Sequence, residues 1–140
     1  MGIQMEFQVY EEVDKVISQI DNSMRDKLLE AVDLVRNEVE ETLTGDRHGR
    51  MYFVPGTRQD YIASAPGEAP ASRLGDLRRS VKGGLEMYRG MLTGFVGSDL
   101  DYAPLLEFGT VRMEPRPWLG PSFDRCAGDI KRMWTKRWFV

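Results

Sequence analysis

The sequence predicts an α+β domain in which N-terminal helices, the second of them long, pack on a small antiparallel sheet and a further helix ends the chain. Two observations support this prediction. Apolar residues recur in steps of three and four along residues 9–43 and again along residues 121–134, as in amphipathic helices. Between them, glycines and β-favouring residues replace the helical period. At 140 residues we expect one core and a single domain over residues 1–140.

The N-terminal helical stripe is interrupted once, at the "DNS" of Asp21–Ser23. All three residue types are preferred at helix N-caps, and the serine followed by Asp26 makes an imperfect capping box. We therefore predict a short helix that ends near Ile20. A longer helix follows and ends near Leu43, with Gly45 closing it.

Short strands and a long loop are expected next. "RMYFV", Arg50–Val54, is typical of a strand, and Tyr61–Ala63 is a weaker second candidate. An extended loop over about residues 55–74 contains most of the segment "YIASAPGEAPASRLG", Tyr61–Gly75, which we call the arm. Prolines suppress helix and alanines keep the segment thin, so we predict an arm laid along a surface. We expect it to be mobile in a free subunit and ordered against a neighbour.

A short helical turn and a hairpin follow the loop. Asp76 is predicted to cap one helical turn that places Leu77 against the core. The stretches "SVKGGLEMY" and "MLTGFVGS" then flank Arg89 and Gly90 as the two strands of a hairpin. Three glycines weaken these strands and predict either bulges or close backbone contacts: Gly83, Gly84 and Gly94.

Two helical segments complete the chain. "DYAPLLEFGT" predicts a helical turn that starts near Ala103 and Pro104 and stops at Gly109. Pro121 is expected to open the last helix. Its apolar face is predicted to contain Phe123, Ala127, Ile130 and Trp134, and Cys126 beside it is expected in the core or at its margin.

The residue inventory argues against catalysis and against a resident cofactor or metal. One cysteine excludes an internal disulfide and a multi-cysteine metal site. The single histidine, His48, lies in a glycine-flanked basic turn and is expected at the surface. Phosphate-binding glycine motifs are absent from the sequence. Glu68 and Glu107 could form a hydrolytic carboxylate pair, but nothing in the sequence brings them together.

Localisation and charge are also informative. No stretch approaches the roughly 18 apolar residues of a membrane span and the N-terminus lacks a basic start, so we expect a protein made in a cytoplasm without membrane contact. Residues 1–46 have a net charge of −8 and residues 47–140 a net charge of +5. The two halves could attract each other within one fold. Alternatively, each copy could offer an acidic face to the basic face of a neighbour.

Nucleic-acid contact is a further possibility that the sequence leaves open. "RHGRMYF", "LRRS" and "KRMWTKRWF" mix basic and aromatic residues, as phosphate-contacting and base-stacking surfaces do. The net charge of the whole chain is −3, whereas a dedicated nucleic-acid binder is usually basic throughout. The alternative is a cationic helix end whose tryptophans pack on the sheet or on a partner.

Three stretches, in this order and spacing, resemble one protein family. They are "ASAPGEAPA" followed by "GDLRRSV" (the first motif), "VGSDLDYAPLLEFGT" (the second) and "MEPRPWLGPSF" (the third). Together they resemble the tail-component or tail-completion (neck) proteins of long-tailed double-stranded DNA bacteriophages. The resemblance covers about residues 45–123. The family pattern often has histidine, threonine and alanine where this chain has Tyr61, Leu74 and Ser122.

The resemblance implies a structural virion protein of the head-tail junction rather than an enzyme. It implies assembly in a host bacterial cytoplasm, a homo-oligomeric ring, contact with other neck and tail proteins, and transient contact with DNA in the channel. A terminator, a completion factor and another neck component remain equally open. The alternative is a DNA-contacting virion or packaging factor.

The candidate interface and assembly residues come from the arm and from the second and third motifs. We expect Arg116, stiffened by flanking prolines, to bind a carboxylate or a helix end, with Glu107 as a candidate partner. Gly109 is expected to take a positive φ and Trp118 to be a buried anchor. The full candidate set is Tyr61, Ser64, Pro66, Gly67, Glu68, Pro70, Glu107, Phe108, Gly109, Thr110, Arg116, Pro117 and Trp118.

Overall fold

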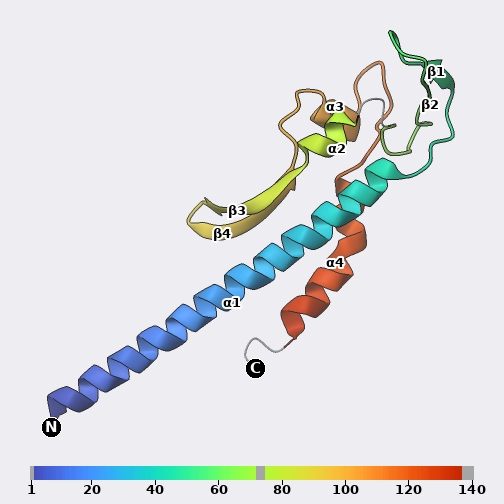
Figure 1. Cartoon of the computed structure of the whole chain (residues 1–140). Coiled ribbons are helices and arrows are strands. Elements are labelled where there is room, and N and C mark those ends of the chain that lie inside the picture. Colours follow the sequence, from blue (N-terminus) through green and yellow to red (C-terminus); the bar gives the residue numbers. More distant parts are fainter. Residues whose placement is uncertain (1, 72–74, 137–140) are drawn as a thin grey trace.

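A computed structural model describes residues 2–71 and 75–136, with side chains described from Lys15 onward. Leu74 and the final residues of the basic aromatic C-terminus lie outside these ranges. The described chain is an α+β fold with a long N-terminal helix, two small antiparallel hairpins and a C-terminal helix, as the sequence predicts. Figure 1 shows the β3–β4 hairpin and helix α4 beside α1, whose N-terminal half projects beyond them.

Helix α1 (Gly2–Thr44) is one continuous helix of 43 residues, about 65 Å long at 1.5 Å per residue. The prediction of two helices separated at Asp21–Ser23 is therefore wrong. Asp, Asn and Ser each cost at most about 0.7 kcal/mol in a helix interior, and no glycine or proline follows Gly2 before Gly45. Arg25 Nε also lies 3.2 Å from Asp21 Oδ2, one turn away, which stabilises the helical conformation there.

The predicted antiparallel strands form two separate hairpins. In the first, β1 (Met51–Phe53) pairs with β2 (Asp60–Ile62), and Tyr52 lies opposite Tyr61 with ring centroids 5.9 Å apart. The expected loop over residues 55–74 therefore contains a strand. In the second hairpin, β3 (Lys82–Tyr88) pairs with β4 (Met91–Gly97) around the predicted turn.

The glycines of the second hairpin permit a close approach to α1. Pairing between β3 and β4 is unbroken from Lys82↔Gly97 to Tyr88↔Met91, so the predicted bulges are absent from this ladder. The alternative prediction, close contact, is confirmed. A Cβ at Gly83 would lie 2.7 Å from Val32 Cγ1, and a Cβ at Gly94 would lie 2.9 Å from Val32 Cγ2.

Two short helices surround the hairpin's open end. Helix α2 (Asp76–Ser80) buries Leu77 as predicted, but Asp76 does not cap it. The cap residue is Gly75, with a φ of 72°, and Asp76 pairs instead with Arg79 at 2.6 Å. Helix α3 (Ala103–Phe108) begins and ends where the sequence predicts.

Helix α4 (Gly120–Thr135) packs along α1 through a face that the apolar pattern does not identify. Its buried residues are Ser122, Cys126 and Met133. Phe123 and Ala127 are exposed, so the prediction placed the buried face about one residue out of position. The apolar pattern does not identify this face because Ser122 is polar and Cys126 is small. Burial raises the pKa of the Cys126 thiol, consistent with a core role.

The core lies where α1, α2, α3 and α4 converge, towards the C-terminal end of α1. Three α1 residues one turn apart, Val35, Val39 and Leu43, supply one side of it. The opposite side consists of Leu77, Val81, Ala103, Trp118 and Cys126. Among the described residues, no helix is both long and apolar enough to cross a membrane.

The close approach of α1 to the hairpin predicts the effect of adding one methyl group. Gly94→Ala should lower the free energy of unfolding by about 1–3 kcal/mol, because the new Cβ overlaps the buried Val32. Gly97→Ala is the matched control on the same strand, since no atom lies within 4 Å of its added Cβ. Urea unfolding followed by circular dichroism measures both. Equal effects of the two substitutions would contradict the packing described here.

Candidate functional site

The three family-like motifs meet at the C-terminal end of α1, in a region that we call the junction. It comprises residues 61–71 of the arm, helix α3 with its following turn, and residues 113–121 before and at the start of α4. Figure 1 shows α3, the loop before α4 and the segment after β2 near this end of α1. Hydrogen bonds between charged side chains and backbone groups hold the junction together.

Glu107 joins the second motif to the third. Its carboxylate accepts hydrogen bonds from the backbone N–H groups of Trp118 (2.8 Å), Leu119 (2.9 Å) and Gly120 (2.9 Å). These donors belong to the start of α4, where backbone N–H groups lack partners within the helix and the helix dipole favours an anion. Glu107 therefore caps α4 from another helix.

Arg116 joins the third motif to the arm. Its guanidinium donates to both the carbonyl oxygen and the hydroxyl of Ser64, which is 6% exposed. Its backbone N–H donates to Leu106 O at 2.7 Å. The predicted Glu107–Arg116 pair does not form within the chain, because each side chain has found backbone partners. Glu107 nevertheless joins α3 to the start of α4, through backbone amides rather than through Arg116.

Trp118 and Gly109 have the roles that the sequence predicts. Trp118 is 2% exposed, and its Nε1–H donates to Ala103 O at 3.3 Å. Gly109 has a φ of 74°, and a Cβ there would lie 2.8 Å from both Met113 O and Pro115 N. A tight bend after α3 thus requires glycine.

The arm contains a turn closed by Glu68. The Glu68 N–H donates to Ala65 O at 3.0 Å, and Gly67 has a φ of 82°. In return, the carboxylate accepts from Ala65 N at 2.8 Å and from His48 N at 3.0 Å, and His48 Nδ1 lies 2.5 Å from Oε1. The Ala65 and His48 hydrogen bonds lower the pKa of Glu68 from 4.5 to about 2.

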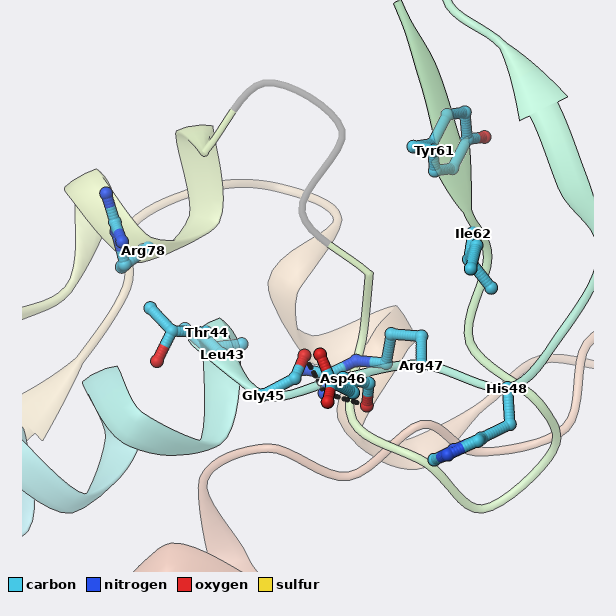
Figure 2. Close-up of a pocket in the computed structure, with 9 residues that line it drawn as sticks. All are labelled: Leu43, Thr44, Gly45, Asp46, Arg47, His48, Tyr61, Ile62 and Arg78. Atoms are coloured by element: carbon cyan, nitrogen blue, oxygen red, sulfur yellow. Dashed lines mark hydrogen bonds between the residues drawn. The ribbon is translucent and has the colours of Figure 1, made fainter.

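Arg47 fixes the other end of the arm to α1. Its guanidinium donates to Pro70 O in the arm (3.1 and 3.0 Å) and to Thr42 O in the last turn of α1 (2.6 Å). It also binds the carbonyls of Gly45 and Asp46, and Figure 2 shows the side chain turned back along the chain towards them. A cation near the last carbonyls of a helix is favourable. The role of Arg47 was not predicted from the sequence, although a basic residue just after a helix end is a usable signal for it.

These bonds change the expectation for the arm. It is attached to its own chain through Arg116 at Ser64, through its turn at His48, and through Arg47 at Pro70. The Ala63 N–H also donates to Arg50 O at 2.8 Å, which continues the β1–β2 ladder. The same chain therefore supplies the contacts that were expected to come from a neighbouring subunit.

The remaining candidates divide by exposure. Tyr61, Pro117 and Glu68 are half-buried, and Pro70 is buried beside Ser64. Pro66, Gly67, Phe108 and Thr110 are exposed and are the members of the candidate set that an additional molecule could contact directly. Phe108 is 79% exposed at the end of α3.

Ser122 is a second residue whose role the sequence analysis missed. Its hydroxyl is fully buried, lies 2.8 Å from Thr42 Oγ1 and donates to Trp118 O at 2.6 Å. The buried serine hydroxyl is thus accommodated by a threonine on the facing helix. This pairing links α4 to α1 directly beside the junction.

The carboxylates of the described residues are dispersed rather than gathered as metal ligands. Among these residues, no group of three or more histidine, cysteine, aspartate or glutamate side chains could hold a metal ion. Glu68 and Glu107 are each occupied by backbone amides in different parts of the junction. A pocket of about 620 Å³ between the end of α1, β2 and α2 contains Arg47, His48 and Arg78 among its lining residues (Figure 2).

Comparisons with protein-family models, with curated proteins and with solved structures found no match to this chain.

The capping role of Glu107 predicts a specific loss of stability. Glu107→Gln replaces one accepting oxygen by an NH₂ group and removes the charge, so we expect the free energy of unfolding to fall by about 1–3 kcal/mol. Glu114→Gln, at an exposed position in the loop before α4, removes the same charge and should have little effect. Urea denaturation compares the two variants. A Glu107 variant as stable as the Glu114 variant would contradict the capping role.

The Glu68 turn predicts a dependence on pH. The folded-state pKa of about 2 lies below the ordinary value of 4.5, so the carboxylate stabilises the arm above about pH 4.5 and this contribution is lost as the pH falls towards 2. The amide resonances of Ala65 and His48 should therefore titrate with a midpoint near 2 in an NMR pH series. Glu68→Gln should abolish that titration. A midpoint near 4.5 would show that the turn is not formed as described.

Proposed function

We propose that this protein is a non-catalytic structural component of the head-tail junction of a long-tailed double-stranded DNA bacteriophage, where it forms a homo-oligomeric ring. The observation that supports this proposal is the convergence of the three family-like motifs. Segments separated by up to 52 positions in the chain are joined by Arg116 to Ser64 and by Glu107 to the start of α4. The motif residues share a structural role, which is to fix the arm, α3 and the start of α4 relative to one another.

The chemistry of the junction favours assembly over catalysis. A general acid or nucleophile needs a side chain that can reach a substrate, with a second group to activate it. Glu107, Arg116 and Trp118 instead spend their polar atoms on backbone groups of the same chain. Such hydrogen bonds fix the relative positions of the arm, α3 and α4, as a subunit that repeats in a ring requires.

The exposed residues around the junction are suited to contact with another protein. Phe108, Leu105 and Val111 are 79%, 50% and 106% exposed on and after α3. Pro66 and Gly67 are also exposed, at the turn of the arm. A fixed scaffold with apolar side chains directed outwards is typical of a subunit surface.

The alternative of a DNA-contacting factor gains less support. Its strongest motivation is the basic aromatic C-terminus, but Met133 in that sequence is 5% exposed and Trp134 is half-buried. The carbonyl oxygens of Met133 and Lys136 accept hydrogen bonds from Lys27 of α1. The described part of this segment therefore packs towards α1 rather than presenting a stacking surface.

The proposed function predicts a defined defect in virion assembly. In the phage or prophage that contains the gene, we expect capsid and portal genes on one side and tail tube genes on the other. An amber mutation in the gene should leave heads and tails that fail to form complete joined particles, as seen by electron microscopy. The full chain supplied in trans should restore complete virions and be present in them.

The same complementation assay contains its control. Glu114→Gln should restore complete virions as well as the unaltered chain does. Normal virions from the amber mutant, or a chain absent from purified particles, would exclude a structural role at the head-tail junction.

A further inference from the structure

We infer that the apolar stripe on the N-terminal half of α1 binds an apolar groove of a second copy of this chain, so that subunits associate head to tail. The inference rests on the proposed function only for its biological setting. Its physical basis is that one chain displays two apolar surfaces, a projecting helix side and a groove, which cannot meet each other within the chain.

The stripe is the first of these surfaces. Val16, Ile17, Ile20 and Met24 are 51%, 57%, 40% and 38% exposed, although their helical spacing places them on one side of α1. This part of the helix projects beyond the hairpin and α4 in Figure 1. Apolar residues at helical spacing extend further back along the sequence to Val9 and Val13. A projecting helix with such a side is suited to a protein partner.

The groove is the second surface. It has a volume of about 570 Å³ and lies between α1, β4 and α4, with Phe108 of α3 among its lining residues. Leu28 and Val32 of α1, Phe95 of β4, and Phe123 and Ile130 of α4 supply most of its apolar character. Phe123 is 51% exposed in the groove, so the fold of the chain leaves part of the predicted apolar face of α4 open.

The stripe cannot enter the groove of its own chain. The stripe is part of α1, which is a single continuous helix from Gly2 to Thr44. The same helix also forms one wall of the groove. A helix without an internal glycine or proline cannot fold back on itself over that distance. A stripe that fills the groove must therefore belong to another copy of the chain.

Charge favours the same pairing. Residues 2–26 of α1 contain six acids and two bases, a net charge of −4. The charged residues that line the groove itself are Glu107, whose carboxylate accepts backbone hydrogen bonds, and Asp124. The basic charge lies at one end of the groove, in the segment 131–136, which follows Ile130, includes Trp134, and contains three exposed bases and no acid. An acidic helix seated in the groove would place opposite charges at the edge of the contact, which favours association and fixes orientation.

The contact has a geometric consequence. The stripe of one copy and the groove of the next are different surfaces, so the interface is heterologous and leaves one stripe and one groove free at each step. Repetition of such a contact gives a ring if the rotation closes and a filament if it does not. A pairing of stripe with stripe would be isologous and would stop at two copies.

Two variants of the full chain test the inference. Val16→Glu with Ile20→Glu alters the stripe, and Phe123→Glu alters the groove; all three positions are exposed, so the fold should be retained. The matched controls are Ser18→Glu with Asn22→Glu, exposed positions on the opposite side of α1, and Phe53→Glu in β1, where the phenylalanine is 77% exposed outside the groove. Circular dichroism verifies folding, and light scattering after size exclusion measures mass.

We expect the wild type and both controls to form oligomers, and each test variant alone to remain at the chain mass of 16.0 kDa. An equimolar mixture of the two test variants should form a species of two chains and no larger, because only one intact stripe and one intact groove remain for each pair. Association of the wild type should weaken at high salt.

Three results would overturn the inference. They are a wild type that stays monomeric at every accessible concentration, a Phe123→Glu variant that assembles like the wild type, and a mixture that fails to form two-chain species. The second result would favour pairing of stripe with stripe. An oligomer with the expected variant behaviour but no part in virion assembly would exclude the proposed function while leaving the contact intact.

Discussion

The capping of α4 by Glu107 is the interaction on which the rest of the structure depends. The N–H groups at the start of a helix lack partners within it. Here a carboxylate from α3 accepts hydrogen bonds from Gly120, the first residue of α4, and from the two residues before it. The adjacent Trp118 is buried in the core and bonded to Ala103, so the same few residues determine both the origin and the direction of α4. The position of α4 then determines the face it packs on α1 and the groove between them.

Helix α1 connects this junction to the outer part of the molecule. Its C-terminal half is buried through Val35, Val39 and Leu43, whereas residues such as Val16 and Ile17 remain exposed. A single helix of 43 residues would be only marginally helical along its free half if propensity alone stabilised it. The packed half supplies the nucleus, and each further residue of the free half adds one hydrogen bond to a helix already formed. Gly83 and Gly94 contribute because they let the hairpin lie close against the packed half.

Periodic features of the sequence were sufficient to predict most elements, but contacts across the chain were not. The helices, the Arg89–Gly90 turn, the Gly109 stop and the burial of Trp118 all follow from local patterns. The break at Asp21–Ser23 was wrong because capping residues terminate a helix only when the chain gains by leaving it. The buried face of α4 was wrong because Ser122 is buried by virtue of a partner, Thr42, that lies 80 positions away.

The partners of Arg47 and Arg116 could not be predicted from local sequence patterns either. Both arginines donate to backbone carbonyls, and every residue has a carbonyl, so no sequence signal identifies which one is chosen. Glu107 was the apparent partner of Arg116 because opposite charges attract. In the structure the carboxylate instead accepts hydrogen bonds from three amides at a helix start, and the half-buried guanidinium binds Ser64.

The charge asymmetry is only partly used within the chain. Within the described part of the chain, Arg125 and Glu38 form an ion pair of 2.5 Å between α4 and α1, whereas Arg25–Asp21 and Arg36–Glu40 lie within α1 itself. Partly exposed pairs of this kind contribute little to stability. Exposed acids such as Asp26, Glu30 and Asp33 instead leave α1 with a negative surface. That surface acts over the distance between molecules, where it repels a parallel copy of the same helix and attracts the basic end of α4 in another. Electrostatics therefore disfavours the parallel pairing of two stripes and favours a helix seated beside a cationic segment, which is the condition for subunits that associate in one direction.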